Sequence, residues 1–226
     1  MAKGVGCRIY KTVNRPDREI VEAFKGIPVP NISDNMGRIF CMDSYIKSYN
    51  DLKFVGTAIT VKAPIGDNLM FHKAIELAQL GDVIVIDGEG DMCHSLCGEL
   101  MMTEAMKKGV VGFIVDGCIR DVESLKTMNF SVYAKGVNPK GPFKNGPGEI
   151  NVPISCGGQV VFPGDIIVGD LDGVVVIKAA DAEEILEKAK KHNKMEQGKF
   201  DDIQNNALDK SWVDKKLKEI GCIIYE

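Results

Sequence analysis

An arginine and an aspartate stand side by side just after an apolar run of the chain. The run VVGFIVDG covers residues 110–117, and Arg120 and Asp121 follow it. A guanidinium group can make two parallel hydrogen bonds to a carboxylate. An adjacent aspartate can hold a hard divalent cation such as Mg²⁺ through one oxygen, with water in most other coordination positions. A carboxylate receptor beside a Lewis acid suits the stabilisation of an enolate that forms next to a carboxylate.

A second segment would bring further groups to the same place. The stretch DGEGDMCHSLCGEL (87–100) is expected to leave a strand as a glycine-rich loop and to enter a helix near Gly98. Free backbone N–H groups at that helix start, from Gly98 and Glu99 to Leu100 and Met101, would favour an anion. The Glu99 side chain could also hold the waters of a divalent cation.

A less specific role for the Arg-Asp pair stays open at this point. A lone arginine beside an aspartate at a strand end commonly forms a surface ion pair of little energetic value. Asp121 could also cap the helix that the segment VESLKTM (122–128) predicts. Spacing alone does not decide between these roles and a catalytic one.

The candidate residues follow the two strands of a predicted βαβ unit. GDVIVIDG (81–88) and VVGFIVDG are continuous apolar runs, typical of strands buried on both faces. GELMMTEAMKKG (98–109) lies between them and predicts a helix, which ends at two lysines and Gly109. Ligands of open α/β sheets bind beyond the carboxyl ends of the strands. The pattern therefore predicts that Gly98 and Arg120 share one rim of the sheet.

The remaining segments complete a single α/β domain over residues 1–226, with a mixed sheet and helices on its faces. Helices are predicted over 17–25, over 31–40 with Asn31 or Ser33 as the cap, and over 68–80, and a strand is predicted over 55–63. A loop rich in glycine and proline covers 136–150, and short strands separated by turns cover 150–178. An amphipathic helix covers 180–197, with Asp181 near its start, and a polar tail that contains Trp212 follows.

The composition and net charge limit the classes of protein to which this chain can belong. The chain has 226 residues, of which 45% are hydrophobic and 27% are charged, an ordinary mix for a globular protein. A net charge of −4 gives no electrostatic case for nucleic acid or an anionic membrane as a partner. Neither a signal peptide nor a run of membrane-spanning length is evident, so a cytoplasmic location is expected.

Motifs that would indicate other kinds of binding site are incomplete in this sequence. The seven cysteines are scattered, and free thiols are expected. Cys93-His94-x-x-Cys97 has no second ligand pair for zinc. The Gly-x-Gly of 88–90 lacks the third glycine of a dinucleotide fingerprint, and neither a phosphate loop nor the nucleoside-binding loop of a methyltransferase is evident. His72 and His94 are expected to be structural or solvated.

Together these motifs resemble a known family. The stretch GDVIVIDGEGD…CGELMMTEAMKKGVVGFIVDGCIRDVESL, with GGQVVFPGDIIVGDLDGVVVI after it, is similar to the RraA-like group, and the likeness runs from about Ile32 to Glu196. The signature of that group is an acidic residue, twenty intervening positions, Arg-Asp and another acidic residue. Glu99, Arg120-Asp121 and Glu123 match it.

The resemblance implies a fold, a site and an activity. The fold would be an αββα sandwich related to swivelling β/β/α domains, assembled as trimers or hexamers with sites between subunits. Arg120 would bind the carboxylate of a pyruvyl group, Asp121 would bind Mg²⁺ or Mn²⁺, and Glu99 would bind the metal-bound waters, with the backbone amides of 98–101 completing the pocket. Glu196 would reach the metal-bound waters of a neighbouring subunit.

The implied activity is that of a class II pyruvate aldolase. Such an enzyme cleaves a 4-hydroxy-2-oxo acid to pyruvate through an enolate, and oxaloacetate decarboxylation is the expected side activity. The group also includes a protein that binds and inhibits a ribonuclease. A regulatory protein without catalysis is therefore the alternative.

Overall fold

The computed structural model describes residues 4–225 and divides into two compact units, Met1–Ala189 and Lys190–Glu226. The expectation of one domain over the whole chain stays a prediction.

The centre of the first unit is a nine-stranded sheet. Its main order is β1-β7-β3-β4-β5-β6-β2, and β10 and β11 continue from β3. The strands are β1 (Cys7–Ile9), β2 (Lys47–Ser48), β3 (Phe54–Lys62), β4 (Asp82–Cys97), β5 (Gly112–Ile119), β6 (Ser131–Val137), β7 (Gly148–Ile150), β10 (Ile166–Asp170) and β11 (Gly173–Ile177).

Four parallel strands, β3 to β6, form the middle of this sheet. Residues 83–86 of β4 and 113–115 of β5 are fully buried, because side chains cover both faces of these strands. The first half of β3 also pairs with β10 in antiparallel fashion, with Phe54 opposite Gly169. β3 thus joins the parallel strands to the β10–β11 hairpin.

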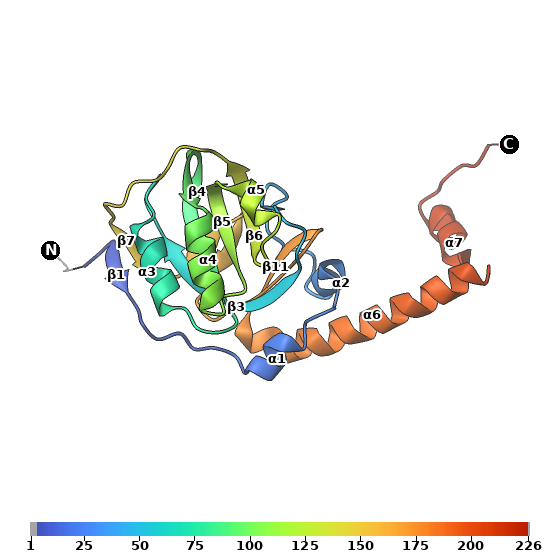
Figure 1. Ribbon diagram of the computed structural model, residues 1–226. Coiled ribbons are helices and arrows are strands. Elements are labelled where there is room, and N and C mark those ends of the chain that lie inside the picture. Colours follow the sequence, from blue (N-terminus) through green and yellow to red (C-terminus); the bar gives the residue numbers. More distant parts are fainter. Residues whose placement is uncertain (1–3, 226) are drawn as a thin grey trace. The chain divides into compact units, whose positions relative to one another are not determined.

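Helices and strands make four layers. α3 (Leu69–Leu77), α4 (Glu99–Lys107) and α5 (Val122–Leu125) pack on one face of the parallel strands, as Figure 1 shows for α3 and α4. The opposite face packs against β10, β11 and a separate hairpin of β8 (Ile154–Cys156) and β9 (Gln159–Val161). Outside that layer lie α1 (Arg18–Glu22), α2 (Val29–Asp34) and the start of α6 (Ala182–Gln204). The predicted αββα arrangement is confirmed.

The glycine-rich segment after residue 87 differs from the prediction of a loop. It continues β4 as far as Cys97, and Asp91, Ser95 and Cys97 pair with β5 across register shifts. Gly90 has a φ of 68°, a conformation that suits a bulge. The polar residues that suggested a loop therefore lie on a bulged strand.

Other boundaries also differ. α2 begins at Val29 after Pro28 and carries no side-chain cap, so the predicted caps at Asn31 and Ser33 are wrong. β6 was not predicted, because its residues directly precede the glycine- and proline-rich stretch. α6 follows a short 3₁₀ turn over Ala179–Asp181 and is longer than predicted.

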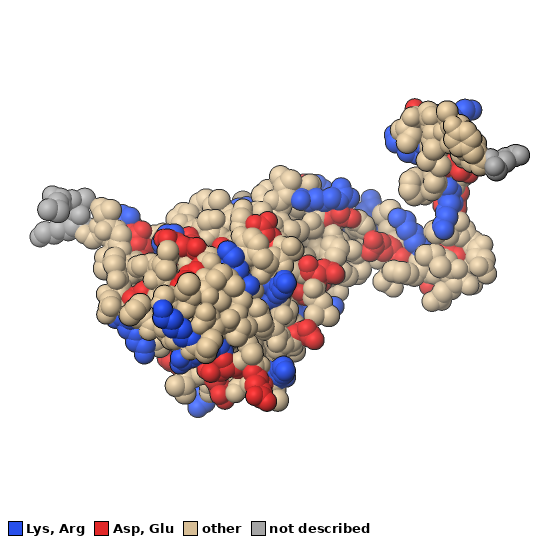
Figure 2. Space-filling view, turned by 90° about the horizontal axis from the view of Figure 1, so that it is seen from above, with Lys and Arg blue, Asp and Glu red and all other residues tan. Residues whose placement is uncertain are grey.

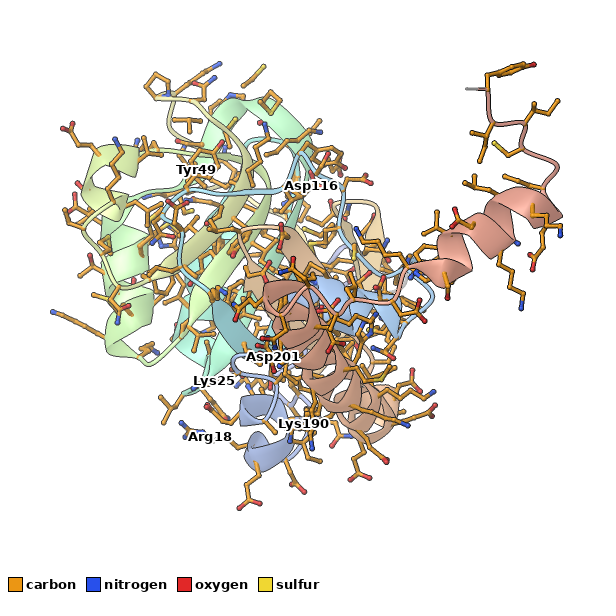
Figure 3. The ribbon with its side chains drawn as sticks, turned by 90° about the vertical axis from the view of Figure 1, so that its right-hand side faces the viewer. Arg18, Lys25, Tyr49, Asp116, Lys190 and Asp201 are labelled. Carbon is orange, nitrogen blue, oxygen red and sulfur yellow. The ribbon has the colours of Figure 1, made fainter. Side chains whose placement is uncertain are left out.

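The second unit contains the later turns of α6, where Lys190 and Asp201 lie (Figure 3), and α7 (Ser211–Glu219). α7 occupies the segment predicted as a polar tail. None of the side chains described in this unit is buried.

Charged side chains of both signs are interspersed on the face drawn in Figure 2. Within residues 4–225, no helix is both long enough and apolar enough to cross a membrane.

Candidate functional site

The ends of β4 and β5 bring the predicted site residues together. Cys97 and Ile119 are partners in the parallel ladder, and the backbone N–H of Arg120 donates to the Cys97 carbonyl at 3.0 Å. Gly98 and Arg120 are thus neighbours across two strands, as the βαβ pattern predicted. α4 starts immediately after Gly98, and α5 starts immediately after Asp121.

Asp121 turns its carboxylate toward α4. Its backbone is left-handed, with φ 60° and ψ 35°, which aspartate tolerates better than most residues. Its Oδ2 accepts a hydrogen bond from the backbone N–H of Glu99 at 3.0 Å, and its side chain makes no cap bond to α5. Asp121 therefore occupies the N-cap position of α5, as the alternative allowed, but its carboxylate bonds to the start of α4 and not to α5.

Gly98 leaves room for that carboxylate. A Cβ atom at Gly98 would lie 2.2 Å from Asp121 Oδ2, 3.1 Å from Arg120 Cγ and 3.2 Å from Arg120 Nε. The φ of Gly98 is −152°, an extended value that any residue adopts. Glycine is required here because the Arg-Asp pair approaches the backbone closely.

The Glu99 carboxylate is held by a residue that the sequence did not suggest. Ser124 Oγ, on α5, donates to Glu99 Oε2 at 2.8 Å. The N–H of Glu99 already binds Asp121, so it is not one of the free amides expected at this helix start. The amides of Leu100 and Met101 lie in the first turn of α4, beyond the reach of intrahelical carbonyls.

The guanidinium group of Arg120 keeps its donors available. The side chain is 44% exposed, and its Nε lies 3.7 Å from Asp121 Oδ2. That distance is too long for a hydrogen bond, and no other acceptor bonds to this guanidinium within the part of the chain that the structure describes. A Cβ atom at Gly141 would lie 3.1 Å from Arg120 Nη1. The planar guanidinium fork of Arg120 therefore lies beside the backbone of two glycines, Gly98 and Gly141.

A cleft of about 130 Å³ opens beside these groups. Met101 is buried in its wall, whereas Leu100 is 85% exposed. Burial raises the pKa of the Cys97 thiol far above its ordinary value, so Cys97 is not a nucleophile at neutral pH. The cleft is lined by Asn68, His72, Ser95, Leu96, Cys97, Gly98, Leu100, Met101, Arg120, Asp121, Pro142 and Lys144.

Asn68 and Lys144 were not predicted from the sequence. Asn68 is buried, and its Nδ2 donates to the Leu96 carbonyl at 2.8 Å. Its Oδ1 has no hydrogen-bond partner among residues 4–225, and an unpaired buried acceptor costs about 1–3 kcal/mol. Lys144 comes from the loop rich in glycine and proline. The sequence feature that could have indicated Lys144 was the position of its loop, which follows a strand that neighbours β5.

The two histidines have different surroundings. His72 lines the cleft, and its pKa is lowered, mainly by burial and then by the charge of Lys144. His94 Nδ1 lies 2.8 Å from Asp91 Oδ2, and its ring packs near Phe143. His94 therefore has a structural role, as expected.

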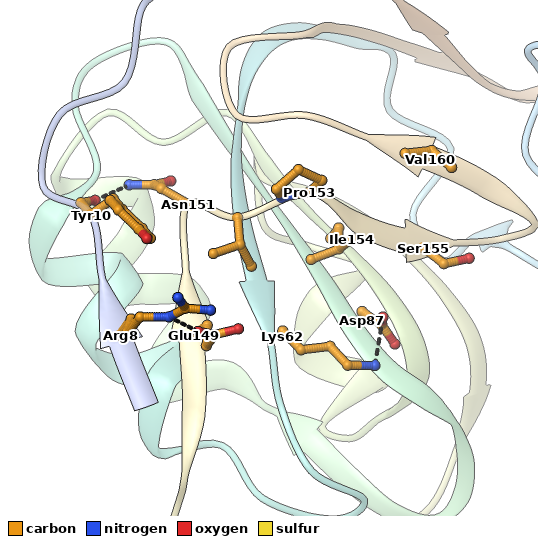
Figure 4. A pocket seen from close by; sticks show the side chains of 11 residues that line it. Arg8, Tyr10, Lys62, Asp87, Glu149, Asn151, Pro153, Ile154, Ser155 and Val160 are labelled. Atoms are coloured by element: carbon orange, nitrogen blue, oxygen red, sulfur yellow. Dashed lines mark hydrogen bonds and ion pairs between the residues drawn. The ribbon is translucent and has the colours of Figure 1, made fainter. Parts of the chain in front are cut away.

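A larger hollow of about 710 Å³ lies elsewhere on the first unit, and Figure 4 shows the residues that line it. Its charges pair with one another. Lys62 Nζ binds Asp87 Oδ2 at 2.9 Å, and Arg8 binds Glu149. Since these cations already have carboxylate partners, the smaller cleft with its open guanidinium is the better candidate for binding an acid.

The donor set suits a weakly held hard cation. No three residues among His, Cys, Asp and Glu converge as a metal cluster within residues 4–225. Mg²⁺ can nevertheless bind through one or two carboxylates and several waters. Asp121 is 41% exposed and uses only Oδ2 in the bond to Glu99, which leaves Oδ1 available, and Glu99 lies beside it. A single-carboxylate site at Asp121 therefore fits these residues.

Glu196 lies in the second unit, on α6, with its Oε1 3.6 Å from His192 Nε2. Its expected role in another subunit's site stays a prediction. Glu123, the last signature residue, is exposed in the first turn of α5.

Comparison with known proteins decides the family. A model of the RraA-like family, described as Aldolase/RraA, matches residues 29–176, more than half of the chain. The chain belongs to the RraA-like family. Glu99, Arg120 and Asp121 all lie within the matched region.

RraA-like relatives carry different names. A protein of Halalkalibacterium halodurans named "Putative 4-hydroxy-4-methyl-2-oxoglutarate aldolase" is 40% identical over 87% of this chain and 94% of its own length. The structure of Streptomyces coelicolor RraAS2, titled as an unusual member of the RNase ES inhibitor RraA family, is 25% identical with a TM-score of 0.73, covering 82% of this chain and 98% of that one. A Geobacillus kaustophilus structure is titled as an S-adenosylmethionine:2-dimethylmenaquinone methyltransferase. It is 31% identical with a TM-score of 0.63, and the match covers 67% of this chain and 94% of that one.

Proposed function

We propose that this chain is a divalent-metal-dependent aldolase that cleaves a 4-hydroxy-2-oxo acid to pyruvate. The observation that carries the proposal is the geometry at Gly98. The glycine admits the Asp121 carboxylate against the start of α4, and the neighbouring Arg120 fork keeps its donors open. The aldolase name of the relative that is 40% identical supports the same activity.

The substrate carboxylate binds to Arg120. The planar fork offers two parallel N–H donors, and the amides of Leu100 and Met101 at the start of α4 add partial positive charge. The guanidinium lies beside the backbone of Gly98 and Gly141, where larger residues would crowd it.

Cleavage moves one proton and one electron pair. The C4 hydroxyl loses its proton, the C3–C4 bond breaks, and its electrons form the enolate of pyruvate while C4 becomes a carbonyl. The enolate then takes a proton at C3. Glu99 is the carboxylate that orients the water which relays this proton, and the bond from Ser124 holds Glu99 in place.

Asp121, through its remaining oxygen, would hold Mg²⁺ or Mn²⁺, and Glu99 would hold the waters of that cation. When bound, the cation supplies positive charge that stabilises the developing enolate oxygen. Oxaloacetate shares the 2-oxo acid end, and loss of CO₂ from it yields the same enolate. Oxaloacetate decarboxylation is therefore the side activity.

A second copy of the chain completes the site. The cleft of about 130 Å³ is smaller than the ~300–1,000 Å³ usual for ligand pockets, and the apolar Leu100 at its wall is largely exposed. In a trimer or hexamer, Glu196 of a neighbouring subunit would cover this side and take part in proton transfer. A covered site would exclude the water that otherwise competes for the enolate.

Pyruvate release tests the proposal. Purified protein with Mg²⁺ is given 4-hydroxy-4-methyl-2-oxoglutarate or oxaloacetate, and pyruvate is followed through a coupled NADH assay. Mg²⁺ alone and the Arg120→Lys variant are the controls, because lysine cannot reproduce the bidentate fork. The wild type should release pyruvate from both, and Arg120→Lys should lose most of kcat/KM while remaining folded. Release no faster than with Mg²⁺ alone would refute the activity.

The alternative is a regulatory protein that binds a ribonuclease without catalysis. The likeness to RraAS2 favours it as the second candidate. Binding of a ribonuclease by protein that releases no pyruvate would support this role.

A further inference from the structure

Phe143, which directly precedes Lys144 in the loop over 138–147, is hydrogen-bonded to the turn before α3. The Phe143 N–H donates to the Gly66 carbonyl at 2.7 Å, and the Phe143 carbonyl accepts from the Asn68 N–H at 3.0 Å. These two bonds fix the backbone on one side of Lys144.

A buried carboxylate fixes the other side. Asp67 Oδ2 accepts from the backbone N–H groups of Asn145 at 2.6 Å and Gly146 at 2.9 Å. Hydrogen bonds to an ionised acceptor are stronger than neutral ones. Because residues on both sides of Lys144 are held, its Cα has a defined position beside the cleft.

Lys144 adds a second positive charge to the cleft that contains Arg120. A Cβ atom at Gly141 would lie 3.1 Å from Arg120 Nη1, and the Cα atoms of Gly141 and Lys144, three residues apart, are separated by at most about 11 Å. Lys144 is exposed, and no carboxylate among residues 4–225 pairs with it. The cleft thus offers two cations to one small ligand.

The other groups near Lys144 do not cancel its charge. His72 lines the same cleft, and burial lowers its pKa, which disfavours its charged form. Glu104 acts on His72 in the opposite direction but weakly. Asp121 and Glu99 are at the α4 start, where they serve the proposed cation.

We infer that Lys144 is a specificity-determining residue that binds the second carboxylate of a dicarboxylic substrate, while Arg120 binds the first. The inference rests on the proposed function and adds the distal end of its substrate. An ammonium group acts as a point charge without a fixed plane. It therefore suits a distal carboxylate whose direction varies with the substituents on C4.

The experiment compares a diacid with a monoacid. Steady-state kinetics are measured with 4-hydroxy-4-methyl-2-oxoglutarate and with 4-hydroxy-2-oxopentanoate, which lacks the distal carboxylate. Lys144→Gln should lower kcat/KM for the diacid about tenfold, mainly through KM, and leave the monoacid unchanged. Lys140→Gln is the matched control, because it removes a charge from the same loop without lining the cleft, and it should change neither. Equal loss for both substrates, or no loss, would overturn the inference.

A binding measurement separates this inference from the proposed function. Calorimetry with Mg²⁺ compares 2-oxoglutarate with 2-oxopentanoate, and neither needs to be cleaved. Tighter binding of 2-oxoglutarate by the wild type, lost in Lys144→Gln, would support the inference even where no pyruvate is released. Equal affinity of wild type and Lys144→Gln for 2-oxoglutarate would overturn it even in an active aldolase.

Discussion

Replacing Gly98 by alanine should inactivate the protein without unfolding it. The new Cβ would meet Asp121 Oδ2 at 2.2 Å, whereas ordinary contact begins at about 3.4 Å, so the carboxylate has to move by 3.4 − 2.2 ≈ 1.2 Å. Arg120 Cγ and Nε, at 3.1 and 3.2 Å, have to move by a few tenths of an ångström. A misplacement of about 1 Å can cost roughly 10²-fold in rate. We therefore expect kcat/KM for pyruvate formation to fall at least about 100-fold.

Gly141→Ala gives a graded comparison. Its Cβ would lie 3.1 Å from Arg120 Nη1, so only the end of the arginine has to shift, and the loss should be tenfold or less. Neither glycine has a positive φ, so backbone strain does not contribute. Both variants should keep the circular dichroism spectrum of the wild type. Near-normal kinetics for Gly98→Ala, or a larger loss for Gly141→Ala, would refute the proposed roles of Asp121 and Arg120.

Two further predictions concern the cation and the assembly. Activity should disappear after chelation with EDTA and return with Mg²⁺ or Mn²⁺, because a single carboxylate, Asp121, holds the ion weakly; full activity after exhaustive chelation would exclude a required metal. Arg120→Ala and Glu196→Ala should each be nearly inactive as pure oligomers, and unfolding and reassembling them together should restore part of the activity, since some interfaces would regain one intact site. Recovery no greater than the sum of the separate variants would place Glu196 outside a shared site.

The sequence was sufficient to predict the framework of the site. The apolar runs at 81–88 and 110–117 are long enough only for strands, and a helix of strong periodicity lies between them, so parallel strands with a common rim were the expected result. Gly98 and Arg120 lie at that rim because the ladder pairs Cys97 with Ile119. A buried strand can be recognised from its local sequence, and the position of the strand also fixes the position of the residues that directly follow it.

Contacts across long stretches of sequence could not be predicted. The bond from Ser124 to Glu99 joins two helices through hydroxyl and carboxylate groups that are ordinary surface residues in sequence. Asp67 lies 78 residues before Asn145, and nothing local marks it as the anchor of that loop. The bulged end of β4 was also missed, because its pairing depends on β5 and its own residues have the composition of a loop.

The fold cannot choose among the activities named for its relatives, since an aldolase, a ribonuclease-inhibitor family and a methyltransferase are all similar to this chain. The choice has to come from the site. A surface that only binds a partner protein has no need to exclude a Cβ at Gly98, whereas a site that positions Asp121 and Arg120 for one small acid does. The loop held by Asp67 also carries Lys144 to the same cleft, where its ammonium group would meet the second carboxylate of the proposed substrate.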